Sequence, residues 1–147
     1  MAEHTASVQW TRRGHPFTYD GYSRDHAVTF ENGRSALASA APDYLGNAEA
    51  LNPETLLLGA LASCHMLTFL AVAAKRGYVV ESYSDRATGT LAKNAEGRIA
   101  ITHARLQPVI VFSSEKKPDD AELARLHAKA HENCFIANSI HTEVSIS

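Results

Sequence analysis

The chain has 147 residues, of which 45% are hydrophobic and 20% are charged, and its formal net charge at pH 7 is −2. This length suits one hydrophobic core, so we expect residues 1–147 to form a single domain. The weak net charge and the scattered basic residues exclude a concentrated basic face. We therefore expect no nucleic-acid partner.

The N-terminus bears on the compartment. It does not combine a basic segment with an apolar run, so we expect no secretory signal and a cytoplasmic location. Two cysteines in a reducing compartment are more often catalytic, redox-sensing or inert than a structural disulfide. The role of Cys64 and Cys134 is therefore the first functional question.

The first fifty residues have the composition of short strands and turns. Strand-like segments are Ser7–Trp10, Phe17–Tyr22 and His26–Phe30. Asn32-Gly33 predicts a hairpin turn after the last of them. Residues 41–51 are expected to form a loop that leads into a helix.

A long helix is predicted from Pro53 to Arg76. Asn52 suits the N-cap, and Glu54 places a carboxylate at the positive end of the helix dipole. Residues 56–74 carry no formal charge, and this uncharged run is about as long as a membrane span. Small and polar side chains dilute this run and strands follow it, so we expect no membrane and a helix buried on nearly all sides. A second subunit is expected to cover part of it.

The second half of the chain predicts a hairpin, a helix and a final strand. The hairpin strands are expected over 78–91 and 98–112, with a bulge near 103–105. A helix is expected over 119–132, and an alternating strand over 142–146. This order indicates an α+β fold with a mostly antiparallel sheet.

Cys64 is the leading candidate nucleophile, although an isolated helical cysteine is more often a packing residue. His65 cannot pair with it, because adjacent helical side chains diverge. Glu54 lies ten residues earlier, about 15 Å along a straight helix, so it reaches Cys64 only across an interface or a bend. Cys134 is either a resolving thiol or a small buried residue.

A metal site is a weaker alternative. His127, His131 and Cys134 are spaced to lie within two turns of one helix, which would suit a zinc ion with an open position. The glutamate of the zincin motif is missing, and leucines already define the apolar face of that helix. We therefore expect no metal and no bound cofactor.

Two blocks of sequence resemble the OsmC/Ohr family of thiol peroxidases. The first is Asn52-Pro53-Glu54 followed by Leu-Leu-Leu-Gly-Ala-Leu-Ala-Ser-Cys64-His-Met, and the second is Ala130-His-Glu-Asn-Cys134-Phe-Ile-Ala-Asn-Ser. Ser63-Cys64-His65 is closer to the OsmC-like branch than to Ohr proper. The resemblance spans nearly the whole chain and implies an intertwined homodimer with a long buried helix at its centre.

The resemblance also implies an activity, the reduction of organic hydroperoxides to alcohols in oxidative or osmotic stress defence. It implies Cys64 as the peroxidatic thiol, Cys134 as the resolving thiol and an external thiol as the reductant. Glu54 matches the activating glutamate, and Arg24, rather than Arg34, is our choice for the activating arginine. The alternative is a non-enzymatic dimeric protein that binds a small ligand or senses redox state.

Overall fold

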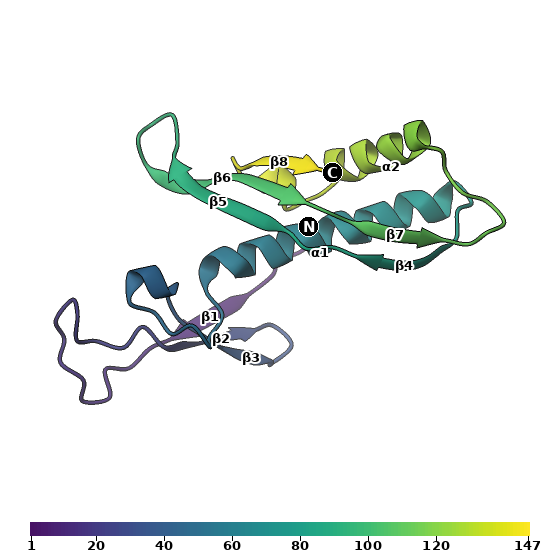
Figure 1. The fold of residues 1–147 in the computed structure, drawn as a ribbon. Coiled ribbons are helices and arrows are strands. Elements are labelled where there is room, and N and C mark those ends of the chain that lie inside the picture. The colour runs from purple at the N-terminus through teal and green to yellow at the C-terminus, as the bar shows by residue number, and fades with distance from the viewer. The chain divides into compact units, whose positions relative to one another are not determined.

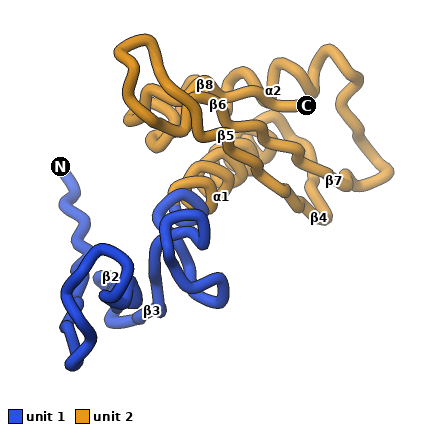
Figure 2. Tube along the Cα trace, turned by 60° about the vertical axis from the view of Figure 1, so that its left-hand side comes forward, with its two compact units in different colours: residues 1–56 blue, residues 57–147 orange.

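The computed structural model describes all 147 residues and has an α+β fold. The chain divides into two compact units, residues 1–56 and residues 57–147 (Figure 2). The sequence prediction of a single domain stays a prediction. The long helix α1 begins at the end of the first unit and runs through the second.

The first unit holds an antiparallel sheet in the order β1-β2-β3, followed by a short 3₁₀ helix. Its elements are β1 (Ala6–Gln9), β2 (His26–Phe30), β3 (Ser35–Ala38) and η1 (Pro42–Tyr44). The predicted turn at Asn32-Gly33 is confirmed, with Gly33 at a φ of 82°. The strand predicted over 17–22 is wrong: the Gly21 N–H donates to the Thr18 carbonyl at 3.0 Å, which closes a turn there.

Helix α1 (Pro53–Lys75) begins where its sequence predicts and ends one residue before the predicted Arg76. Asn52 Oδ1 accepts a hydrogen bond from the Thr55 N–H at 2.9 Å, and Gly77 ends the helix with a φ of 81°. By length and composition alone α1 could cross a membrane, a criterion that core helices also meet.

The burial of α1 differs from the expectation. Within one chain a single stripe is buried, and its members are four residues apart: Leu61, His65, Phe69 and Ala73. The opposite face is open, and Leu67 there is 62% exposed. One chain alone therefore buries a single face of α1, and the cover expected from a second subunit stays a prediction.

The second unit carries five strands and the second helix, α2. Its elements are β4 (Val80–Ser84), β5 (Thr88–Lys93), β6 (Ile99–Leu106), β7 (Val109–Phe112), α2 (Asp120–Glu132), η2 (Ala137–Ser139) and β8 (Glu143–Ile146). β4 pairs with β7 and β5 with β6, both antiparallel, whereas β8 lies parallel to β6. The mostly antiparallel arrangement is confirmed.

Each of the two long predicted strands is divided in two. Pro108 has no N–H to donate, and the N–H of the preceding Gln107 turns to Asp85 Oδ1 at 2.7 Å. The ladder is therefore interrupted at both positions. The bulge is at Thr102, one residue before the predicted range, because His103 pairs with Thr90 while Ile101 pairs with Leu91.

Two core clusters lie along α1 in this unit. The thiol cluster consists of Leu61, Ala104, Leu106 and Cys134. The aromatic cluster consists of Phe69, Ala73, Leu126 and Ala130, and it joins α1 to α2. Figure 1 shows α2 beside the C-terminal half of α1, with β4 and β7 along it.

Candidate thiol site

The structure brings the two cysteines together. Cys64, on α1, is partly buried and packs against the thiol cluster, to which the fully buried Cys134 belongs. Both cysteines are free thiols. Residues seventy positions apart in the sequence are therefore neighbours in the fold.

The thiol of Cys134 is held in the turn between α2 and η2. Its N–H donates to the His131 carbonyl at 3.3 Å, and the Ala137 N–H donates to its sulfur at 3.4 Å. Burial, above all, raises the pKa of this thiol; the Ala137 N–H opposes the shift and the neighbouring Cys64 thiol adds to it. Cys134 is therefore held as an enclosed, protonated thiol, and Cys64 is the more accessible of the two cysteines.

Glu54 lies in the first turn of α1, where its sequence places it. Its Oε2 atom is buried and has no hydrogen-bond partner within the chain. A desolvated carboxylate oxygen without a donor is costly, so its surroundings are incomplete in one chain.

Arg24 lies in the first unit and is occupied locally. Its guanidinium stacks on the Tyr22 ring at 3.7 Å and donates to the carbonyls of Tyr19 and Tyr22. It forms no ion pair with Glu54 in the chain. Arg34 is exposed at the hairpin turn. The roles of Arg24 and Glu54 beside Cys64 stay predictions.

Our sequence predictions assigned no role to His65, and the structure places it in contact with a second histidine. His65 is 1% exposed, and its Nε2 lies 3.0 Å from Nδ1 of His127 on α2. Burial, and then the nearby His127 and His131, lower the pKa of His65 to about 4. The only sequence signal for this contact is the position of His65 on the buried stripe of α1.

The spacing that suggested zinc does not gather its residues into one set of ligands. His127 contacts His65, whereas Cys134 packs beside Cys64, so the first and last residues of the H-x3-H-x2-C pattern have different partners. No three histidine, cysteine or acidic side chains of the chain are grouped as metal ligands.

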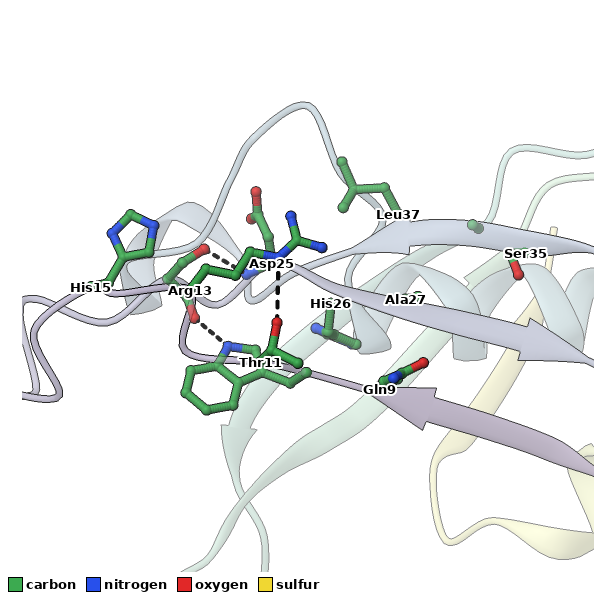
Figure 3. A pocket seen from close by; sticks show the side chains of 12 residues that line it. Gln9, Thr11, Arg13, His15, Asp25, His26, Ala27, Ser35 and Leu37 are labelled. Atoms are coloured by element: carbon green, nitrogen blue, oxygen red, sulfur yellow. Dashed lines mark hydrogen bonds between the residues drawn. The ribbon is translucent and has the colours of Figure 1, made fainter.

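A separate cavity of about 700 Å³ lies in the first unit, over β1 to β3 and the loop at 11–15 (Figure 3). Arg13, His15, Asp25 and His26 are the charged or titratable residues that line it, and the figure labels all four. The Trp10 indole N–H donates to the Ser23 carbonyl at 2.7 Å on the same side. The cavity contains no thiol, so it does not compete with the cysteine pair as a redox site.

Comparison with known proteins places this arrangement in a family. The family model described as OsmC-like protein matches residues 46–147, which include both cysteines and Glu54. This range is more than half of the chain.

Three relatives illustrate the similarity. An OsmC-like protein of unknown function from Vibrio cholerae is 46% identical, with a TM-score of 0.95 over 100% of this chain and 99% of that one. The uncharacterized protein YmaD of Bacillus subtilis is 27% identical over 126 residues, 84% of this chain and 83% of the relative. An organic hydroperoxide resistance protein, OsmC, from Legionella pneumophila shares the fold with a TM-score of 0.76 at 22% identity, over 100% of this chain and 96% of that one.

Proposed function

This chain belongs to the OsmC-like protein family, and from that premise we propose that it reduces organic hydroperoxides with Cys64 as the peroxidatic thiol and Cys134 as the resolving thiol. One observation carries the proposal: a partly accessible thiol lies next to a fully buried one whose pKa is raised. The names of structural neighbours such as the Legionella pneumophila protein agree with this activity.

The first step oxidises Cys64. Its thiolate attacks the distal oxygen of the hydroperoxide, an S–O bond forms and the O–O bond breaks. The leaving alkoxide takes up a proton and departs as the alcohol, while Cys64 becomes a sulfenic acid. Apolar side chains dominate the thiol cluster, which favours an organic hydroperoxide over hydrogen peroxide.

The second step closes a disulfide. Cys134 loses its proton and attacks the Cys64 sulfur, and the hydroxide of the sulfenic acid leaves as water. An external thiol then reduces the disulfide by exchange and is itself oxidised to a disulfide. No bound cofactor is required.

Activation of Cys64 is proposed to involve a second subunit. The unpartnered oxygen of Glu54 and the open face of α1 both favour an interface with another copy of the chain. In such a dimer an arginine, Arg24 in our proposal, would pair with Glu54 and place its positive charge beside the Cys64 sulfur.

Stopped-flow consumption of cumene hydroperoxide tests the proposal. We expect C64S to fall to the buffer rate, because no other accessible thiol remains. C134S should consume one equivalent and then stop as a sulfenic acid that dimedone traps. Peroxide consumption by C64S at the normal rate would refute the proposed function.

Thiol counting separates the proposal from a non-enzymatic role. One equivalent of hydroperoxide should convert two free thiols per chain into none, and dithiothreitol should restore both. A ligand-binding protein with inert cysteines would retain two free thiols.

A further inference from the structure

His65 is the one strongly polar side chain on the buried stripe of α1. It lies between Leu61 of the thiol cluster and Phe69 of the aromatic cluster. Its Nδ1 atom is buried and has no hydrogen-bond partner. Burying an imidazole here costs free energy that an apolar residue would avoid, so its contact with His127 requires a reason.

The contact between the two imidazoles is well formed. His65 Nε2 and His127 Nδ1 are 3.0 Å apart, and the two rings are nearly parallel, at 8°. The Phe69 ring packs against the His127 ring, with the two ring centroids 4.5 Å apart. We assign the proton to His65 Nε2, because the bare His65 Nδ1 is then an unpaired acceptor and not an unpaired N–H.

This hydrogen bond is the buried polar contact between the two helices. The other polar contact, from the Arg76 guanidinium to Glu122 at 2.9 Å, lies just past the C-terminal end of α1 and is partly exposed to solvent. The His65–His127 bond alone therefore acts near the cysteines.

Both histidines are close in the chain to a cysteine. Cys64 directly precedes His65 on α1, and Cys134 follows the C-terminal end of α2, seven residues after His127. The N–H of Cys134 is itself bound to the last turn of α2, at the His131 carbonyl. A shift of α2 along α1 would thus separate the two sulfurs.

From these contacts we propose that His65 and His127 are positioning residues, which hold the Cys134 end of α2 against the Cys64 turn of α1. The pair raises the effective concentration of one thiol at the other. It acts on disulfide formation and not on the attack of Cys64 on peroxide. The inference rests on the proposed disulfide between Cys64 and Cys134.

The test is the equilibrium of the Cys64–Cys134 disulfide in glutathione redox buffers, which reports the effective concentration of the two thiols. H127F keeps a ring against Phe69 but removes the hydrogen bond. We expect the equilibrium constant to fall about tenfold in H127F, the size of one net buried hydrogen bond. Dimedone trapping should show an unchanged rate of Cys64 oxidation and a slower loss of sulfenic acid.

Conservative and matched variants separate positioning from general stability. H127N places an amide near the position of Nδ1, and H65Q places one near Nε2, so each should recover most of the equilibrium constant. Leu123 lies one turn before His127 on α2 and packs against the aromatic cluster. L123A therefore removes packing there and retains the imidazole pair. We expect it to lower stability to urea and leave the disulfide equilibrium within twofold.

The outcomes are distinguishable. If the unchanged protein forms no Cys64–Cys134 disulfide in any buffer, the proposed function itself fails. If the disulfide forms and H127F matches the unchanged protein, or L123A is as impaired as H127F, the positioning role is refuted. If H127F does not fold, H127Q replaces it. The amide of glutamine lies beyond the position of Nδ1, so H127Q also lacks the hydrogen bond to His65.

Discussion

The thiol cluster and the aromatic cluster use the same stripe of α1 in different ways. In the thiol cluster aliphatic side chains surround a buried sulfur, and a second, more accessible sulfur adjoins it. In the aromatic cluster Phe69 is 0% exposed and contacts the rings of Tyr83, Phe112 and His127. The first cluster contains the groups that can react, and the second contains the large surfaces that join α1 to α2 and to the strands.

The comparison shows how a small unit separates reactivity from stability. Aromatic rings bury the most area per side chain, so we expect the aromatic cluster to contribute more to the free energy of folding than the thiol cluster. Four measurements test this division.

The largest expected effect is on stability. Phe69→Ala should cost about 3–5 kcal/mol, because it removes a fully buried ring and leaves a cavity. Leu61→Ala in the thiol cluster should cost about 2–5 kcal/mol and serves as the comparator. Urea unfolding measures both. A cost below about 1 kcal/mol for Phe69→Ala would contradict the role given to the aromatic cluster.

Acid should destabilise the protein through His65. Its pKa is lowered to about 4 in the fold, so the unfolded chain binds the extra proton first as the pH falls. Stability should be full above about pH 6.5 and should decrease between about pH 6.5 and 4, by up to about 3 kcal/mol.

The neighbours of this imidazole also titrate, so a variant is needed to isolate its contribution. His127 and His131 on α2 face His65, and Asp85 acts on His127. Urea unfolding at several pH values should give a flatter profile for H65Q than for the unchanged protein. Equal profiles would assign the acid sensitivity to the other groups.

The rate of the resolving step should depend on pH. Since burial raises the pKa of Cys134, its thiolate is scarce at neutral pH and increases about tenfold per pH unit. Single-turnover loss of dimedone-reactive sulfenic acid should accelerate about 100-fold between pH 6 and 8. In C134S the rate of sulfenic acid loss should not rise with pH in this way. A rate that does not change with pH in the unchanged protein would exclude Cys134 as the attacking thiol.

The smallest effect is expected at Tyr83. Its hydroxyl is buried without a hydrogen-bond partner, and burial, followed by the nearby Asp85, raises the pKa of that hydroxyl. Tyr83→Phe should leave stability unchanged or increase it by about 0.5–1 kcal/mol, because it removes an unsatisfied polar group. Thermal unfolding of Tyr83→Phe is the check, with Tyr78→Phe as the control. A loss of more than about 1 kcal/mol in the free energy of unfolding of Tyr83→Phe would mean that the hydroxyl has a hydrogen-bond partner.

Local signals in the sequence determined much of this protein. The cap at Asn52, the glycine at Gly77 and the cap at Asp119 set the ends of the two helices, because these interactions involve residues only a few positions apart. The Asn-Pro-Glu motif and the two cysteine blocks also indicated the family that the comparisons show.

Only the tertiary structure decided the rest. The parallel pairing of β8 with β6 and the division of the long strands depend on contacts between distant segments, such as Gln107 with Asp85. The contact of His65 with His127 spans sixty-two positions, and that of Cys64 with Cys134 spans seventy. Periodicity places a residue on a face of its own element, but packing between elements selects which distant side chain meets it.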